Sequence, residues 1–395
     1  MTVQDTLQAV RAHEDEFIAL RRDIHQHPEL PFEELRTSDL VAARLRDWGY
    51  HVERGLGGTG VVGQLQRGDG TRTLGLRADM DALPIQETTG LQYASRNQGV
   101  MHACGHDGHT AMLLAAAKVL AEQGDFSGTL NLIFQPAEEY GTSDCGAVRM
   151  INDGLFDKYP CDAIFSMHNM PGWPQGHLIF REGPMMASSD KVYITLVGHG
   201  GHGAVPHKTA DPVVAAASLV MALQTVVSRN VDPLQTAVVT VGVLQSGRAN
   251  NVIPDSAHLE LSVRALDSEV RSLLQQRITE SAHAQAQSFG VKAEIDYRRG
   301  YAALVNSKDE TDFARQIGTE LVGAERVVPQ APPLTGSEDF AFMLEKCPGS
   351  YLLIGNGDGD KLGACMVHNP GYDFNDANLA IGAAYWALLA RRYLV

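Results

Sequence analysis

The segment from Met101 to Thr110, MHACGHDGHT, holds four side chains that can bind a metal ion. They are His102, Cys104, His106 and His109. Thiolate and imidazole are both good donors for zinc-like ions. A helix rich in Ala and Leu is expected directly after His109, and its N-terminal dipole would favour an ionised thiolate or carboxylate beside it. The segment therefore predicts part of a metal centre; the competing interpretation is a polar loop whose histidines cap the helix.

A pair of carboxylates, Glu138 and Glu139 in FQPAEEY, follows the expected buried strand TLNLIFQ. The carboxyl ends of strands are where α/β proteins bind ligands. Neighbouring side chains in extended backbone point to opposite sides, so one glutamate can hold a metal ion while the other faces water as a general base. Alone, the pair would be interpreted as a solvated acidic turn, because such pairs are common.

Three further segments end expected strands with residues that bind metals. They contain His168 in DAIFSMH, His368 in ACMVHNP, and Asp79 with Asp81 in RADMDALP. A lone histidine at a strand end is more often structural, and the aspartates also suit an Asx-type turn. Alternation along a strand places Asp79 and Asp81 on one face. Five such segments in one domain are hard to assign to chance, so together they favour a shared metal site.

The elements that would position these residues alternate between strands and helices, which predicts an α/β fold with a mostly parallel sheet. Apolar spacing predicts opening helices at Thr6–Arg22 and Thr37–Trp48. VVGQL and TLGLR are expected to form a hairpin that turns at Gly68–Gly70. GLGGTG matches a dinucleotide-binding fingerprint, but a strand rather than a helix follows it, so we interpret it as a decoy.

The expected order of strands and helices changes near Pro184. From 187 to 299 the expected order is β-α-β-β-α-β, which is a ferredoxin-like module. The remaining 1–186 and 300–395 read as one larger α/β domain. The module is therefore expected to be inserted into the larger domain.

Composition and charge limit the classes of protein to which the chain can belong. The chain has 395 residues, 44% hydrophobic and 20% charged, which favours a globular protein of about two domains. A net charge of −15 argues against a nucleic-acid partner, whose binding needs a basic footprint. No apolar run approaches the ~18 residues that span a membrane, and the N-terminus lacks the apolar region of a secretory signal, so we expect a cytoplasmic protein with no membrane partner. The five cysteines are odd in number and form no CxxC pair, so a disulfide framework is not expected.

From RRDIHQHPELPFEE to the last helix, the chain resembles the di-metal aminoacylase and carboxypeptidase superfamily, in its hippurate hydrolase and auxin-conjugate amidohydrolase branch. The motifs that carry the resemblance stand in the family's order: RADMDALP, HACGHDGHT, QPAEE, GHGGHGAVPH and NVIPD. The resemblance implies a zinc-peptidase-like catalytic domain with an inserted ferredoxin-like lid or dimerisation domain. MHNMP replaces the LHxxP of many relatives, and this change of Leu to Met should matter little.

The same resemblance assigns roles in the metal centre. The metal ligands fall on Cys104, His106, Glu139, His168 and His368. Glu138 matches the general base, and Asp81 matches the aspartate that orients a metal-binding group, with Asp79 nearby. Two divalent ions per subunit would polarise a water molecule and the scissile carbonyl. Zinc or manganese suits these donors best, and nickel or cobalt is the alternative.

For the inserted module, the resemblance implies that His202 reaches into the site of a partner subunit and stabilises the oxyanion. That role implies a homodimer or homotetramer built through the module. One alternative is that the module folds over its own domain. Read without the resemblance, His202 with His199 and His207 could instead form a third metal cluster.

Four further positions match substrate contacts of the family: Asn251, Arg264, Gly336 and Ser337. Asn250 adjoins Asn251, so that contact could fall on either residue. Arg264 could hold a substrate carboxylate through two hydrogen bonds, although a surface arginine on a strand would look the same in sequence.

These implications predict hydrolysis of the amide bond of N-acyl-L-amino acids, hippurate-like or N-acetyl, to a carboxylic acid and a free amino acid. One alternative keeps the site but takes a dipeptide or a peptide C-terminus. Another is a non-catalytic protein that binds a metal or ligand on this fold. The retained Glu138 argues against the last, because binding alone needs no base.

Overall fold

The computed structural model describes residues 2–395, and the chain divides into two compact units. The larger unit runs up to Gly183 and includes Val305–Pro332 and Asp339–Val395. The smaller unit comprises Pro184–Leu304 and Pro333–Glu338. It thus begins at 184 where the sequence suggests 187, ends at 304 where the sequence suggests 299, and takes in a short later segment.

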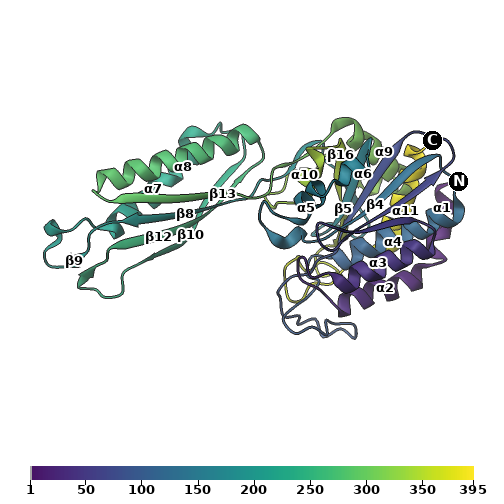
Figure 1. Ribbon diagram of the computed structural model, residues 1–395, viewed down its shortest axis with the longest axis horizontal. Coiled ribbons are helices and arrows are strands. Elements are labelled where there is room, and N and C mark those ends of the chain that lie inside the picture. Colours follow the sequence, from purple (N-terminus) through teal and green to yellow (C-terminus); the bar gives the residue numbers. More distant parts are fainter. Residues whose placement is uncertain (1) are drawn as a thin grey trace. The chain divides into compact units, whose positions relative to one another are not determined.

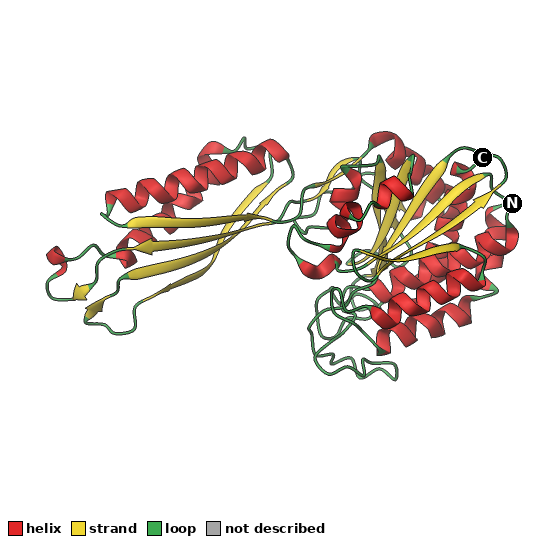
Figure 2. Cartoon of the chain, viewed as in Figure 1, coloured by secondary structure: helices red, strands yellow, loops and turns green. Residues whose placement is uncertain are grey.

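An eight-stranded sheet forms the centre of the larger unit, in the order β1-β2-β4-β3-β5-β16-β6-β15. The strands are β1 His51–Leu56, β2 Gly60–Arg67, β3 Thr73–Asp79, β4 Gly128–Gln135, β5 Ala163–Pro171, β6 Leu178–Ile179, β15 Val327–Val328 and β16 Gly349–Gly357. The neighbouring strands β4, β3, β5 and β16 run parallel. Because helices cover both faces, these central strands are buried along nearly their whole length (Figure 2). The expected α/β class with a mostly parallel sheet is confirmed for this part of the chain.

The expected hairpin between VVGQL and TLGLR is wrong. These segments form β2 and β3, and β4 lies between them, antiparallel to β2 and parallel to β3. The hairpin is instead β1–β2, and GLGGTG supplies its turn. Turn glycines marked a reversal of the chain correctly at both places, but they could not indicate that a strand from residue 128 onward inserts between two neighbours.

Helices cover both faces of this sheet. They are α1 Val3–Arg11, α2 Glu14–Gln26, α3 Leu35–Asp47, α4 His106–Gln123, α5 Gly146–Asn152, α6 Leu155–Lys158, α9 Lys308–Val322, α10 Phe340–Leu344 and α11 Leu379–Tyr393. Figure 1 shows α5, α6 and α10 together, apart from the group that contains α2, α3 and α4. The single opening helix expected from Thr6 is broken, so that α1 packs on α11 and α2 on α4.

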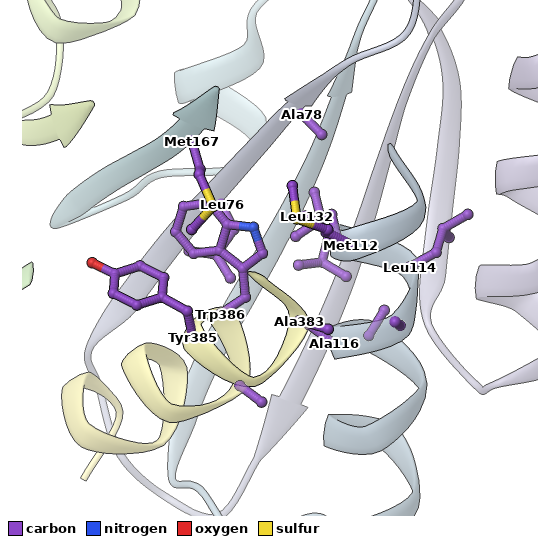
Figure 3. Close-up of a cluster of buried hydrophobic side chains, with 14 of the residues drawn as sticks. Leu76, Ala78, Met112, Leu114, Ala116, Leu132, Met167, Ala383, Tyr385 and Trp386 are labelled. Atoms are coloured by element: carbon purple, nitrogen blue, oxygen red, sulfur yellow. The ribbon is translucent and has the colours of Figure 1, made fainter. Parts of the chain in front are cut away.

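The main core lies between the sheet and the helices α4 and α11. Nearly every side chain of α4 is buried, as expected of a helix that is apolar on all sides. Figure 3 shows these helices meeting the strands through a continuous apolar cluster. The labelled members are Leu76, Ala78, Met112, Leu114, Ala116, Leu132, Met167, Ala383, Tyr385 and Trp386. This packing fixes the position of the N-terminus of α4, where the metal-type ligands begin.

The smaller unit has the β-α-β-β-α-β order that its sequence predicts. Its elements are β8 Asp190–Val197, β9 Gly201–His202, α7 Pro212–Asn230, β10 Ala237–Ser246, β11 Val252–Ile253, β12 Ser256–Ala265, α8 Ser268–Ser288 and β13 Lys292–Arg299. The four long strands form an antiparallel sheet in the order β10-β12-β8-β13. The short strands β9 and β11 pair with each other.

Helix α7 is long and apolar enough to cross a membrane by length and composition. However, it packs against α8 and the sheet of its own unit, and one face supplies buried residues to that core. A core helix passes the same test, so this finding is weak evidence for a membrane span. The opposite face of α7 exposes three apolar side chains, Val213, Val214 and Met221.

Candidate metal centre

Four stretches of the larger unit bring their metal-type side chains together. The start of α4 supplies Cys104 and His106, the turn after β4 supplies Glu138 and Glu139, β5 supplies His168, and the loop before α11 supplies His368. Their ligand atoms form overlapping groups within 4.8 Å: Cys104, His106 and His168; Cys104, Glu139 and His368; His106, Glu138 and Glu139. The convergence that the resemblance implies is therefore present in the fold.

A glycine sets the entry of the chain into α4. Gly105 has a φ of +89°, and a Cβ there would lie 2.1 Å from the Asn169 amide nitrogen and 2.4 Å from the Tyr372 hydroxyl. Asn169 donates a 2.7 Å hydrogen bond to the carbonyl of Cys104, and Tyr372 donates to Asn169 at 2.6 Å. Only glycine fits this close approach. The two polar side chains then fix the backbone of Cys104 between the positions of His168 and the loop before α11.

His106 is oriented as a ligand by Asp81. Its Nδ1 lies 3.1 Å from Asp81 Oδ1, so Nδ1 carries the proton and donates it to the carboxylate. Its Nε2 is buried and has no hydrogen-bond partner. A buried ring nitrogen without a partner is costly. This arrangement is the carboxylate–histidine pairing that metal sites use.

His168 has the complementary arrangement. Its Nδ1 donates to the carbonyl of Asn169, and its Nε2 lies 3.2 Å from the sulfur of Cys104. Burial, followed by the neighbouring His109, lowers the pKa of His168 well below its usual range. The ring is therefore neutral, which is the form that binds a metal ion.

His368 reaches the site through a strained backbone. Its φ is +64°, and its backbone N–H donates a 2.7 Å hydrogen bond to the carbonyl of Ala103. Its Nε2 lies 2.9 Å from Glu139 Oε1, yet that oxygen makes no hydrogen bond of acceptable geometry. Two polar atoms this close without hydrogen-bond geometry suit ligands that face a common ion.

The donors present fit divalent metal ions. His106 Nε2 and Glu139 Oε1 are both buried and without hydrogen-bond partners. Burial, followed by Glu139 and Glu138, raises the pKa of the Cys104 thiol well above its usual range. Without a cation, desolvation and the two carboxylates therefore oppose the thiolate that the helix dipole favours. A divalent cation among these groups would reverse the balance and ionise the thiol.

The two glutamates lie in a turn, so their directions are not set by the alternation of a strand. The strand ends at Gln135, Ala137 has a φ of +52°, and Glu138–Tyr140 forms a single 3₁₀ turn. Glu138 is buried, with 6% of its surface exposed, and Glu139 is half-buried. The expectation of extended backbone here is wrong, because Pro136 and the left-handed Ala137 stop the strand. The carboxylates still reach the same group of ligand atoms as His106.

Two histidines of the MHACGHDGHT segment lie outside the five ligands that the resemblance implies. His109 Nδ1 donates to Asp79 at 2.6 Å, and its Nε2 accepts the backbone N–H of Asn169 at 2.9 Å, so neither nitrogen is available. His102 is buried with both ring nitrogens unpartnered, and it belongs to no group of converging ligand atoms among residues 2–395. The density of His and Cys in the sequence could not separate these two rings from the ligands that the resemblance implies.

The ligand atoms of Asp79, His106 and His109 lie within 4.8 Å of one another, but both oxygens of Asp79 are engaged by the protein. Asp79 bonds His109 through one oxygen and Arg77 through the other, at 2.6 and 2.7 Å. Although burial works against its charge, His106, His109 and Arg77 hold the pKa of Asp79 well below its usual range. The carboxylate is therefore ionised and committed to the protein, which explains its place beside Asp81 without a direct role as a ligand.

Backbone strain concentrates at this site. Within residues 2–395, three non-glycine residues have positive φ: Phe32, Ala137 and His368. Ala137 precedes the glutamates, His368 meets Glu139, and the ring of Phe32 packs on Tyr140 with centroids 4.9 Å apart. Each such residue costs about 1–2 kcal/mol, and strain of this kind gathers where function requires a fixed geometry.

The smaller unit separates the predicted substrate residues into two places. His202 in β9 pairs with Val252, and the N–H of Gly203 donates to the carbonyl of Asn251. Arg264, near the other end of β12, donates to the Ser337 hydroxyl at 3.2 Å, and the carbonyl of Gly336 accepts the N–H of Ala187. Strand β8 spans Asp190–Val197 between these ends, which at ~3.3 Å per residue is about 23 Å. One small substrate cannot touch both places within one module.

His202 is exposed and has a defined tautomer. Its Nδ1 accepts the backbone N–H of Ala204 at 3.0 Å, so its Nε2 carries a proton and faces outward as a donor. Arg264 is half-buried, and burial lowers the pKa of its guanidinium. Neither His202 nor its neighbours His199 and His207 belong to a group of converging ligand atoms within residues 2–395, so a third metal cluster is not present there.

Comparison with known proteins agrees with this geometry. Residues 75–392 match the family model of peptidase family M20/M25/M40. The chain is 46% identical to a hippurate hydrolase of Campylobacter jejuni, over 96% of this chain and 97% of that relative. It is 40% identical to an N-acetyl-L-cysteine deacetylase of Bacillus subtilis, over 94% of this chain and 86% of the relative.

The solved structure of a dinuclear metal binding peptidase of the M20 family from Bacillus subtilis matches with a TM-score of 0.83 and 32% identity. The match covers 97% of this chain and 99% of that one. With the donor groups described above, this likeness supports a site for two divalent metal ions. The chain therefore belongs to peptidase family M20/M25/M40, and it is an amidohydrolase of the branch that its motifs resemble.

Proposed function

We propose that this protein hydrolyses the amide bond of N-acyl-L-amino acids, with hippurate-like or N-acetyl substrates. The observation that carries the proposal is the buried carboxylate of Glu138 beside the converging metal-type donors of the larger unit. The named activities of the two relatives, a hippurate hydrolase and an N-acetyl-L-cysteine deacetylase, support this substrate class.

The proposed ligands of the two ions are Cys104, His106, Glu139, His168 and His368. Bound divalent ions supply Lewis acidity toward the scissile carbonyl and toward water. Asp81 holds the ring of His106 in the tautomer that leaves Nε2 free. Zinc or manganese fits donors that mix a thiolate with carboxylate and imidazole.

Glu138 is the proposed general base. It lies in the same group of atoms as His106 and Glu139, but it is the glutamate whose side chain is more deeply buried. Its carboxylate would take a proton from the attacking water and return it to the leaving amine. A positioned base of this kind contributes about 10²- to 10⁴-fold to the rate.

His202 is the proposed oxyanion donor, and it would act on the site of a partner subunit. Its outward Nε2–H has the chemistry that a developing oxyanion needs. Because about 23 Å of strand separates it from Arg264, the two residues suit different copies of the substrate. Arg264 with Ser337 and Gly336 would hold the substrate carboxylate, and Asn251 would contact the substrate beside His202.

A homodimer or homotetramer through the smaller unit follows from that role. The exposed Val213, Val214 and Met221 on α7 form an apolar face beyond what its own core needs. Strand β10 is an edge of the sheet and exposes Leu244. An unpaired strand edge next to an apolar helix face is suited to association with a second copy. Light scattering of the active protein tests this, and an active monomer would exclude it.

A substrate panel on protein reconstituted with Zn²⁺ or Mn²⁺ tests the proposed function. We expect turnover of benzoyl- and acetyl-amino acids, with little turnover of free dipeptides. The alternative, a metallo-dipeptidase or carboxypeptidase, predicts the reverse order. Elemental analysis of the purified protein identifies the native metal, and cell fractionation tests the expected cytoplasmic location. Metal-loaded protein that hydrolyses no acyl-amino acid would exclude the proposal.

A further inference from the structure

The turn that carries Glu138 is held on both sides by buried carboxylates. The N–H of Glu139, after the base, donates a 2.8 Å hydrogen bond to Asp81 Oδ2. The N–H of Ala137, before it, donates a 2.8 Å hydrogen bond to Glu34 Oε1. Ala137 has a φ of +52°, a conformation that a residue with a Cβ does not keep unaided. The backbone on either side of the base is therefore held by two buried carboxyl groups.

Glu34 is available for this contact because another residue caps its helix. It occupies the N-cap position of α3, where a side-chain oxygen commonly accepts the free N–H groups of the first turn. Those of Arg36 and Thr37 are instead accepted by Glu29, at 2.8 and 2.9 Å. The side chain of Glu34 is fully buried and makes no bond to its own helix. It points into the body of the unit, toward the residues before the base.

The glycine-rich segment that resembled a nucleotide fingerprint holds the other oxygen of Glu34. GLGGTG forms the turn of the β1–β2 hairpin and ends with Thr59 and Gly60. The hydroxyl of Thr59, which is also buried, donates a 2.5 Å hydrogen bond to Glu34 Oε2. The carboxylate is thus fixed by the hairpin on one side and fixes Ala137 on the other.

The placement of Glu34 is unfavourable unless something requires it. Burial, followed by the nearby Asp81, raises the pKa of Glu34 to about 7. Two buried carboxylates of like charge destabilise one another. Neutral side chains of similar size would fill this space at lower cost, so the retained pair indicates a role in the site.

We infer that Glu34 is a positioning residue for the reaction, which fixes the Ala137 N–H and through it the direction of the Glu138 carboxylate. Glu34 touches neither substrate nor the proposed metal ligands in this role. The inference rests on the proposed function, because it assigns Glu138 as the base. Its physical content is separate: one hydrogen bond from Glu34 maintains the left-handed turn at Ala137.

Replacement of Glu34 tests this with activity and with a readout that does not depend on activity. In E34A, kcat should fall roughly 10- to 100-fold with little change in KM, because small displacements of a reacting group cost this much. Exchange of the Ala137 amide with solvent, followed by mass spectrometry with residue-level fragmentation, should accelerate roughly tenfold. Metal content per subunit, measured by elemental analysis, should stay at the wild-type level.

The conservative variants separate positioning from mere stability. E34Q keeps an acceptor within reach of Ala137, so it should recover most of the kcat and of the amide protection. E34D keeps the charge but is too short, so it should resemble E34A. T59V removes the bond that holds the other oxygen of Glu34 but leaves the acceptor of Ala137 in place, so it should lower the melting temperature and lower kcat by less than E34A does.

Three results would overturn the inference: E34A with wild-type kcat, E34D at least as active as E34Q, or T59V more impaired in kcat than E34A. If E34A does not fold, the order of E34Q and E34D decides. Wild-type protein that hydrolyses no acyl-amino acid would refute the proposed function instead. The exchange rate of the Ala137 amide would then still decide whether Glu34 holds the turn.

Discussion

Mixing two inactive variants distinguishes a partner's His202 from one that acts within its own subunit. E138Q lacks the proposed base but keeps His202, whereas H202A keeps the base but lacks the donor. Loss of a base lowers kcat about 10²- to 10⁴-fold, and loss of an oxyanion donor lowers it about 10²- to 10³-fold. Each variant alone should therefore be almost inactive.

The magnitude of recovery follows from the arrangement of the module. His202 lies about 23 Å along the sheet from Arg264, which is too far for both to serve one substrate in one chain. If His202 acts in trans, a mixed dimer contains one site with Glu138 and a partner's His202, and one site with neither. Random pairing at equal amounts makes half of the dimers mixed, so about a quarter of wild-type activity should return.

The assay is hydrolysis of a benzoyl-amino acid by separately tagged variants that are co-expressed and purified through both tags. The doubly selected dimers should then have about half of the wild-type activity per subunit. H199A serves as a matched control, because His199 is an exposed histidine of the same module with no assigned role. Mixing E138Q with H199A should also restore activity, since H199A alone is active. No recovery with H202A, in dimers proven to be mixed, would refute the role in trans.

Four other outcomes are expected from the geometry. E138Q should retain the metal content of the wild type by elemental analysis while kcat falls, and equal loss of both would reassign Glu138 as a ligand. H109A should also retain its metal content, because both ring nitrogens are used by the protein, but its free energy of unfolding in urea should fall by about 1–3 kcal/mol. Although burial disfavours its charge, Asp107 raises the pKa of His25 to about 9, so this pair stabilises the fold below about pH 6.5 and the effect is lost as pH rises through 9. Wild-type protein should thus lose about 3 kcal/mol of unfolding free energy between these limits relative to H25Q, and parallel pH curves would contradict the assignment. Chelation should abolish activity and lower the melting temperature but leave the near-UV circular dichroism native, and a lost spectrum would show that the ions fold the site.

The elements of this protein were more predictable from sequence than their pairing. The helix after His109 and the β-α-β-β-α-β order have strong local periodicity, and both are present. The prediction of a hairpin between β2 and β3 was wrong because β4, which begins about sixty residues after β2 ends, inserts between them. Alternation and turn glycines report on local conformation only, so they could not exclude a neighbour that arrives later in the sequence.

The residue types of the site were predictable, but the hydrogen-bond partners of individual side-chain atoms were not. Cys104, His106 and the glutamates could be named from density and from the resemblance. His109 could not be separated from the ligands, because the backbone N–H that occupies its second nitrogen belongs to Asn169. Asn169 and Glu34 were missed for the same reason: each acts through one hydrogen bond to a distant backbone atom. The one available signal for Glu34 was its position at the end of PELPFEE, a segment with more carboxylates than its helix cap needs.

The strained positions and these distant bonds have one explanation. Each ligand-bearing segment is tied to another by a bond that involves no metal: His368 to Ala103, Glu139 to Asp81, and Cys104 to Asn169. These ties oppose the strain at Ala137 and His368, so the protein itself holds the donors close together. A site assembled this way differs from a zinc finger, whose fold depends on the ion. Its donors stay in place while substrate and product exchange, as a site that must act repeatedly requires.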